Sequence, residues 1–239
     1  MPQVGAVIFD CYGTLIDVRT DESKPEIYRF LSAYLQYYGI SIDEESLKSG
    51  LQRERERFLK NRDELCPDVD LEVVFGNILR KEGRFDRFLT ESCCRLFRLL
   101  SRERLQLFPD VVHVLREMKA HGYPLAMVSD AQKVFTPEEC RMLGLHRFFE
   151  HVVLSTQYGF RKPDPRLHLI ACSLLRVEPG YAVYIGDDAQ RDVRGAKEAG
   201  LATILVDRGA RVLFRETDVK PDLCVKGLWE AWDWIRGRS

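Results

Sequence analysis

The feature that most restricts the fold of this chain is a short apolar run that ends in a carboxylate. Residues 6–9 are all apolar, two of them (Val7 and Ile8) are β-branched, and Asp10 and a turn-forming Gly13 follow. Such a run is typical of a strand that is buried on both faces of a parallel sheet. Because ligands bind at the carboxyl ends of strands in open α/β sheets, Asp10 is expected at a site of chemistry. An aspartate that only caps a turn would give the same local pattern.

A second apolar run favours the chemical interpretation. Residues 181–186 read as another buried strand, and Asp187 and Asp188 stand where that strand should end. Two strands of one parallel sheet would direct Asp10 and this pair into one crevice. Clustered carboxylates repel each other unless a proton or a cation compensates them. Mg²⁺ is the cation expected at a sparse, water-rich site of oxygen ligands.

The rest of the chain predicts an α/β fold with a helical insertion. Apolar residues repeat at helical spacing in four segments between residues 18 and 105, and Asp43 can cap the second of them. From residue 106 strands alternate with helices, which predicts a parallel sheet with right-handed connections. The expected strands are 124–130, 151–155, 181–187, 201–207 and 222–225. We therefore predict a Rossmann-like core with helices on both faces, formed by residues 1–17 and 106–239, and a small all-helical domain over residues 18–105.

Composition restricts the class of partner and the compartment. The formal net charge is −1, so there is no general electrostatic argument for binding nucleic acid or a membrane. Seven scattered cysteines without a CxxC pair are typical of a reduced, cytoplasmic protein, and the start of the chain does not resemble a secretory signal. The expected partner is a small-molecule substrate, and the oligomeric state stays open.

Four motifs in order give the chain a resemblance to a known family. They are the stretch Asp10–Thr14, then Ser129, then Lys162 in the sequence KPDP, and then GDDAQRD over residues 186–192. Together they resemble the motifs of haloacid dehalogenase superfamily hydrolases. The resemblance implies that residues 18–105 are a cap that closes over the site. We expect this cap to join the core only near residues 17 and 105, and to move.

The resemblance also assigns roles to residues. It implies a catalytic set of Asp10 as nucleophile, Tyr12, Ser129 and Lys162. Mg²⁺ would be bound by Asp10, the Tyr12 backbone carbonyl, Asp187 and, directly or through water, Asp188. Asp192 would hold Lys162 in place without binding the metal. The groups expected to contact a phosphoryl group are Thr14, Ser129, Asp130 and Lys162, although Asp130 stands where the family often has Asn.

Tyr12 leaves the reaction open between alternatives. Phosphatases of this family usually carry a second Asp two residues after the nucleophile, where it protonates the leaving group. Dehalogenases of the family carry Tyr there, and a phenol with a pKa of about 10 is a poor general base near neutrality. The Asp187–Asp188 pair favours a Mg²⁺-dependent phosphatase acting on a small phosphorylated metabolite through an aspartyl-phosphate. The alternatives are a metal-independent 2-haloacid dehalogenase and a catalytically weak regulatory or binding protein.

Overall fold

The structure is a computed structural model that describes residues 3–209 and 219–238. Its strands are β1 (Ala6–Phe9), β2 (Ile16–Thr20), β3 (Arg102–Leu107), β4 (Leu125–Ser129), β5 (His151–Leu154), β6 (Ala182–Gly186), β7 (Ala202–Val206) and β8 (Leu223–Val225). Its α-helices are α1 (Pro25–Tyr37), α2 (Glu44–Lys60), α3 (Leu71–Lys81), α4 (Arg87–Ser101), α5 (Val111–Ala120), α6 (Thr136–Met142), α7 (Ser155–Tyr158), α8 (Arg166–Leu175), α9 (Arg194–Glu198) and α10 (Leu228–Arg236). A π-helical turn covers Ala189–Val193.

The core of the molecule is one parallel sheet with β1 near its centre. The strand order is β5-β4-β1-β6-β7-β8, and every neighbouring pair in it is parallel. Phe9 is in register with Met127 on β4 and with Ile185 on β6. The predicted fold class is confirmed, and Asp10 lies at the carboxyl edge between the ends of these two strands.

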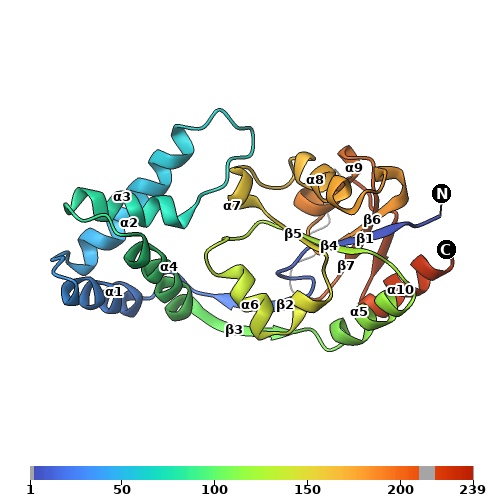
Figure 1. The fold of residues 1–239 in the computed structure, drawn as a ribbon, viewed down its shortest axis with the longest axis horizontal. Helices are drawn as coiled ribbons and strands as arrows, with labels where there is room; N and C mark the ends of the chain where they lie inside the picture. The colour runs from blue at the N-terminus through green and yellow to red at the C-terminus, as the bar shows by residue number, and fades with distance from the viewer. Residues whose placement is uncertain (1–2, 210–218, 239) are drawn as a thin grey trace.

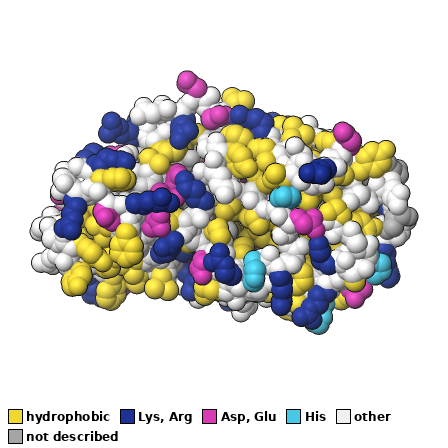
Figure 2. All heavy atoms as spheres, in the orientation of Figure 1, with side chains coloured by type: hydrophobic (Ala, Val, Ile, Leu, Met, Phe, Trp, Pro, Cys, Tyr) yellow, Lys and Arg dark blue, Asp and Glu magenta, His cyan; other side chains and the backbone are white. Residues whose placement is uncertain are grey.

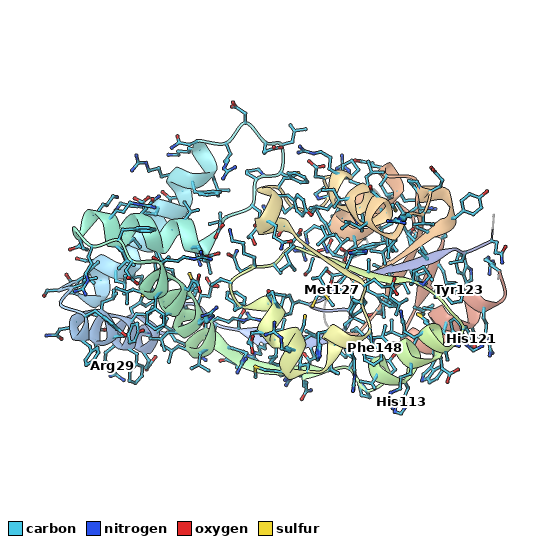
Figure 3. The ribbon with its side chains drawn as sticks, viewed as in Figure 1. Arg29, His113, His121, Tyr123, Met127 and Phe148 are labelled. Carbon is cyan, nitrogen blue, oxygen red and sulfur yellow. The ribbon has the colours of Figure 1, made fainter. Side chains whose placement is uncertain are left out.

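Helices cover both faces of this sheet (Figure 1). Val7 and Phe9 belong to the apolar cluster that contains α5 and α10, whereas Ile8 belongs to the cluster with α8 and α9. Met127, Tyr123 and Phe148 are members of the first cluster and lie in the core half of the molecule (Figure 3). The alternation explains why β1 is apolar at every position: residues on both faces are buried.

The four predicted helices of the insertion are present as α1 to α4. They form a separate lobe beside the core (Figure 1) with their own apolar cluster, which includes Leu31, Phe75 and Phe97. Asp43 caps α2 as the sequence predicts, because its side chain accepts a hydrogen bond of 2.8 Å from the Ser46 amide. We call residues 21–101 the helical lobe below.

A two-stranded ribbon connects the helical lobe to the core, where the sequence pattern predicts helices alone. β2 and β3 pair antiparallel, with Ile16 opposite Leu107, so residues 18–20 and 102–105 are strand although the insertion was expected to be all-helical. The segment Arg102–Leu107 has the composition of a helix or loop on its own. It becomes a strand because β2 supplies the hydrogen-bonding partner, a tertiary effect that overrides local propensity.

The chain joins the helical lobe to the core through β2 and β3, near residues 17 and 105, and the two parts also touch at other places. The segment after β4 docks into the lobe: Val134 is buried in the lobe's apolar cluster, and Gln132 accepts a 2.9 Å hydrogen bond from the Leu71 amide. Lys133 pairs with Asp70 at 2.7 Å. Beside this segment, the Ser155 hydroxyl accepts a hydrogen bond from the Ala131 amide and donates one to Asp68 at 2.5 Å. These contacts involve loops, whose tertiary partners cannot be read from periodicity.

The surface carries charges of both signs. On the face shown in Figure 2, Lys and Arg side chains lie over both the lobe and the core, with Asp and Glu side chains between them. None of the helices in the described part of the chain has the length and apolarity needed to cross a membrane. All seven cysteines are free thiols, as the sequence analysis predicts.

Candidate functional site

A buried ammonium group joins two of the predicted site carboxylates. Lys162 Nζ lies 2.6 Å from Asp10 Oδ1 and 2.5 Å from Asp192 Oδ1, and it is only 3% exposed. Asp10 follows β1, Lys162 precedes α8, and Asp192 lies in the π-helical turn after β6. Asp10 and Asp192 raise the pKa of Lys162 well above its usual value, although burial works in the opposite direction. The lysine is therefore held as a cation against the predicted nucleophile.

Asp187 completes a cluster of three carboxylates. Ligand atoms of Asp10, Asp187 and Asp192 all lie within 4.8 Å of one another. The Thr14 hydroxyl lies 3.3 Å from Asp10 Oδ2 and 3.4 Å from Asp187 Oδ1, so it stands between two of them. The Asp192 Oδ2 atom accepts hydrogen bonds from the backbone amides of Asp187 and Asp188, at 3.1 and 3.0 Å. Asp192 thus orders both the lysine and the loop that carries Asp187.

Gly13 permits this approach of the first loop to Asp187. It has φ of 99°, and a Cβ atom at this position would lie 2.2 Å from Asp187 Oδ2. A side chain here would meet both a strained backbone conformation and a carboxylate. The turn at Gly13 and Thr14 therefore also lies directly against the carboxylate cluster.

The cluster carries more negative charge than its lysine can balance. Three carboxylates and one ammonium group leave two negative charges in a buried place if all are ionised. Burial, and then the Asp192 carboxylate, raise the pKa of Asp187 to about 6, although Lys162 and Arg191 oppose the shift. A divalent cation would neutralise this excess. The donor set fits one, because all its ligands are hard oxygen atoms of the kind that Mg²⁺ prefers.

Asp188 lies outside this cluster. Its carboxylate accepts hydrogen bonds from the backbone amides of Gln190 and Arg191, both at 2.9 Å, and pairs with the Arg191 guanidinium at 2.8 Å. The side chain thus begins the π-helical turn instead of joining Asp10 and Asp187. Of the two adjacent aspartates, only Asp187 is in place to bind a metal directly in this arrangement.

Ser129 and Asp130 occupy the end of β4 beside the cluster. Ser129 is 1% exposed and is in register with Leu154 of β5. Asp130 Oδ1 accepts a 2.9 Å hydrogen bond from the Lys162 backbone amide, so this carboxylate orders the loop that carries the lysine. Its other oxygen lies 3.7 Å from an Arg191 nitrogen. Asp130 is therefore placed as a support for Lys162 more directly than as a contact for substrate.

The Tyr12 hydroxyl points to helix α6. It lies 2.5 Å from Glu139 Oε2 and 3.1 Å from the Thr136 hydroxyl. Burial, with the nearby Cys11 and Glu139 side chains, raises the pKa of the Tyr12 phenol far above its usual value. The phenol is thus a neutral hydrogen-bond donor that is engaged with Glu139, and a weak candidate for a general base.

Three further residues contribute to the site although the sequence analysis did not single them out. The Tyr184 hydroxyl, within β6, lies 3.2 Å from Lys162 Nζ and donates to Asp192 at 3.0 Å. Its only signal was a polar atom inside an otherwise apolar strand. Glu139 and Arg98 have no such signal, because each is one charged residue among many on an amphipathic helix.

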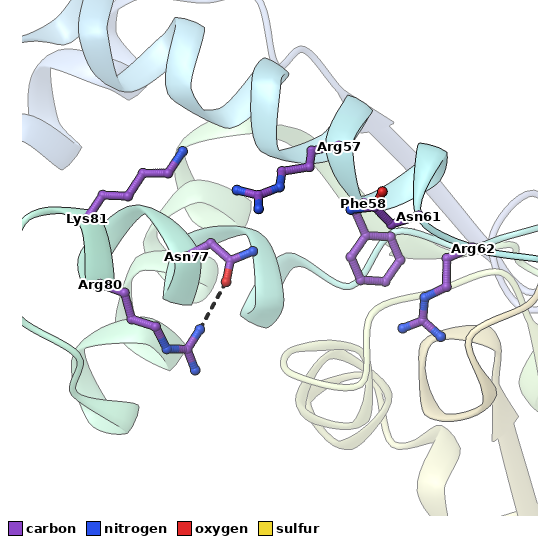
Figure 4. Close-up of a pocket in the computed structure, with 7 residues that line it drawn as sticks. All are labelled: Arg57, Phe58, Asn61, Arg62, Asn77, Arg80 and Lys81. Atoms are coloured by element: carbon purple, nitrogen blue, oxygen red, sulfur yellow. Dashed lines mark hydrogen bonds between the residues drawn. The ribbon is translucent and has the colours of Figure 1, made fainter.

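A separate hollow of about 450 Å³ lies within the helical lobe (Figure 4). It is lined by Arg57, Phe58, Asn61, Arg62, Asn77, Arg80 and Lys81. Arg57, Arg80 and Lys81 are in the last turns of α2 and α3, where cations compensate the helix C-terminal carbonyls. Lys81 also pairs with the buried Glu54. The basic character of this hollow is explained by these structural contacts, and none of its lining residues belongs to the carboxylate cluster.

Curated proteins similar to this chain are phosphatases by name. The chain is 38% identical over 105 residues to a glyceraldehyde 3-phosphate phosphatase of Methanopyrus kandleri, an alignment that covers 44% of this chain and 45% of that protein. It is 34% identical over 160 residues to a phosphoserine phosphatase of Thermus thermophilus, covering 67% of this chain and 63% of that protein. The two alignments thus cover less than two thirds of each relative's own length, 45% of the first and 63% of the second.

Comparison of structures extends the similarity of fold to the whole chain. A crystal structure of a 2-haloacid dehalogenase from Pseudomonas syringae pv. Tomato superposes with a TM-score of 0.74, at 24% identity, over 100% of this chain and 99% of that one. At this identity the likeness shows a shared fold. The model of the haloacid dehalogenase-like hydrolase family matches residues 4–200, which contain all four motifs and the carboxylate cluster. The chain belongs to the haloacid dehalogenase-like hydrolase family.

Proposed function

We propose that this protein is a Mg²⁺-dependent phosphatase of small phosphorylated metabolites that works through an aspartyl-phosphate on Asp10. The observation that carries the proposal is the buried Asp10–Lys162–Asp192 arrangement with Asp187 beside it, where three carboxylates face one ammonium group. The phosphatase names of the aligned relatives support it. The free cysteines agree with a cytoplasmic location, which we keep as part of the proposal.

In the proposed reaction a carboxylate oxygen of Asp10 attacks phosphorus, and the bond from phosphorus to the ester oxygen breaks. The alcohol leaves as an oxyanion with the bonding electron pair and takes its proton from water. The phosphoryl group stays on Asp10 until water attacks it and releases inorganic phosphate and the free carboxylate. Lys162 is fixed beside Asp10, where its charge would stabilise the oxygens of the transferring group. We assign the Thr14 and Ser129 hydroxyls to hold those oxygens, because Thr14 lies 3.3 Å from Asp10 Oδ2 and Ser129 ends β4.

The residues that would hold Mg²⁺ are Asp10 and Asp187, with the Tyr12 backbone carbonyl. When bound, the cation would neutralise the phosphoryl oxygens and the excess charge of the carboxylate cluster. Asp188 would take part only through water, because its carboxylate is engaged with Arg191. Asp192 would act by holding Lys162 and the Asp187 amide.

Tyr12 favours a second candidate, hydrolysis of 2-haloacids. In that reaction Asp10 displaces a halide, which needs no proton, so the absence of a second aspartate after the nucleophile would have no cost. The negative charge of the cluster counts against it, because a 2-haloacid brings its own carboxylate into the site. A third candidate, a binding or regulatory protein, would retain the geometry without turnover.

A parallel assay separates the three candidates. Purified protein is incubated with p-nitrophenyl phosphate, acetyl phosphate or 2-chloropropionate, with and without Mg²⁺, while phosphate and chloride release are measured. We expect phosphate release only with Mg²⁺, and a loss on the order of 10³-fold or more in Asp10→Asn. Asp17→Asn, a carboxylate on β2 that pairs with Arg104, is the matched control and should retain activity. Chloride release without metal supports the dehalogenase, and silence in every assay supports the binding protein.

A further inference from the structure

The Tyr12 hydroxyl contacts a carboxylate that also binds the helical lobe. Glu139, on α6, is 3% exposed and receives the Tyr12 hydroxyl at 2.5 Å. The same carboxylate accepts two hydrogen bonds from Arg98 of α4, with Nε at 2.7 Å from Oε1 and a terminal nitrogen at 2.9 Å from Oε2. One core residue therefore joins the loop of the predicted nucleophile to a helix of the lobe.

The Arg98–Glu139 pair has the geometry of a strong interaction. Two parallel N–H···O contacts are the bidentate arrangement that guanidinium and carboxylate prefer. The Arg98 guanidinium also lies 5.3 Å from the centre of the Tyr12 ring and 5.0 Å from that of Phe135. Arg102, at the start of β3, stands 3.6 Å from the same carboxylate. The helical lobe thus supplies one of the two cations that compensate Glu139, and the connecting ribbon supplies the other.

The burial of Glu139 makes this arrangement cooperative. A buried carboxylate that loses a cation bound to both of its oxygens is strongly disfavoured, so the burial of Glu139 depends on the docking of Arg98. If the lobe moved away, Glu139 would have to take up water, and its short contact with Tyr12 would compete with that water. Lys133 and Asp70 also join core and lobe, but their contact does not involve Tyr12. The Arg98–Glu139 and Lys133–Asp70 ion pairs therefore differ, because only the first is connected to Tyr12.

We propose that Glu139 is a positioning residue that makes the placement of Tyr12, two residues after the nucleophile, depend on docking of the helical lobe through Arg98. With the lobe docked, the Tyr12 hydroxyl is hydrogen bonded to Glu139 of α6. This contact fixes the Tyr12 side chain, and with it the loop from Asp10 to Thr14. With the lobe undocked, the Tyr12 ring is released. The proposal rests on the proposed function only for its kinetic test.

Fluorine NMR tests the coupling without any substrate. The protein contains nine tyrosines, and labelling them with 3-fluorotyrosine gives resonances from which that of Tyr12 is assigned by its loss in Tyr12→Phe. We expect Arg98→Met and Glu139→Gln each to shift or broaden the Tyr12 resonance. Lys133→Met, which breaks the Lys133–Asp70 pair between core and lobe, should leave that resonance unchanged. A Tyr12 resonance that is unchanged in Arg98→Met, with the fold intact by circular dichroism, would overturn the proposal.

A double-mutant cycle tests whether the coupling reaches the reaction. The measured quantity is the turnover of p-nitrophenyl phosphate with saturating Mg²⁺, in Tyr12→Phe, Arg98→Met and the double variant. For independent residues, the fold-change in kcat of the double variant equals the product of the fold-changes of the two single variants. For coupled residues, the two values differ by about tenfold. We expect such a departure for Tyr12 with Arg98, and simple multiplication for Tyr12 with Lys133→Met. Multiplication in both cycles contradicts the proposal.

The two measurements distinguish failure of the positioning role of Glu139 from failure of the proposed function. If wild-type protein releases no phosphate, the proposed function fails while the fluorine resonances still decide the coupling. If wild-type protein turns over and the Tyr12 resonance ignores Arg98, the positioning role of Glu139 fails alone.

Discussion

At the scale of single residues, Gly13 offers the sharpest test of the site's geometry. Its φ of 99° and the 2.2 Å that would separate an added Cβ from Asp187 act together against any side chain. We expect Gly13→Ala to lower the free energy of unfolding by about 1–3 kcal/mol and to abolish activity. Gly83→Ala is the matched control, because Gly83 has φ of 73° and no atom within 4 Å of its added Cβ. Equal activity in the two variants would show that the contact with Asp187 does not matter.

Tyr12 supplies a second prediction at this scale, on the choice of substrate. Without a carboxylate acid at position 12, esters whose alcohols leave without a proton should react faster than alkyl phosphates. We expect Tyr12→Asp to raise kcat/KM for an alkyl phosphate by ~10²–10⁴-fold, with a smaller gain for p-nitrophenyl phosphate. Tyr12→Phe, which removes the hydroxyl and adds no acid, is the control. A folded Tyr12→Asp protein that gains nothing over Tyr12→Phe on alkyl esters would show that another group provides the proton.

At the scale of elements, the question is whether the helical lobe moves. The segment after β4 inserts Val134 into the lobe's apolar cluster, so closure depends on burying this side chain. We expect Val134→Asp to open the molecule, because an unpaired buried charge costs several kcal/mol. Solution X-ray scattering should then show a larger radius of gyration than in wild type.

Met142→Asp is the control for that measurement, since Met142 lies on α6 and is 65% exposed. It adds the same charge to the neighbouring helix without burying it, and the radius of gyration should stay at the wild-type value. Scattering curves of Val134→Asp and wild type that coincide would indicate a lobe fixed by its other contacts, such as Ser155 with Asp68. In that case gating by the lobe would have to be abandoned.

At the scale of the whole molecule, a buried imidazole makes stability depend on pH. His168 is fully buried against Tyr184, and burial, with the charge of Lys162, lowers the pKa of its ring to about 3. Asp192 and Asp164 oppose this shift in part. Between pH 6.5 and 3 the unfolded chain binds a proton at this position and the folded chain does not. The free energy of unfolding therefore falls as pH is lowered, by up to about 1.4 kcal/mol per pH unit from this residue.

His168→Leu removes that contribution. We expect urea unfolding of this variant at pH 6 and pH 4 to show a smaller loss of stability than in wild type. His146→Leu, at an exposed position, controls for the removal of an imidazole and should keep the wild-type slope. Parallel slopes in all three proteins would mean that His168 takes up a proton without unfolding.

Most of the core can be predicted from the periodicity of apolar residues, but the contacts of individual side chains in the candidate site cannot. Strands buried on both faces and helices with one apolar face carry their own periodicity, so β1, β4, β6 and α1 to α4 could be predicted. Asp187 and Asp188 are identical neighbours, and only the turn after β6 decides that one joins the carboxylate cluster and the other pairs with Arg191. The ribbon of β2 with β3, and the contacts of Glu139, depend on partners distant in the chain.

The central place of β1 in the sheet has a consequence for biosynthesis. Ile8 is in register with Ala126 and with Tyr184, so both neighbours of β1 come much later in the chain. Loop closure over such separations is slow, and domains form as the ribosome delivers their parts. A nascent chain that has not yet delivered β6 therefore holds Asp10 on a strand with an unpaired edge and without Lys162's companion Asp192. Asp10, the proposed nucleophile, is among the first residues to be translated and among the last to contact its partners. We therefore expect an unfinished chain to be inactive and exposed to aggregation at that edge.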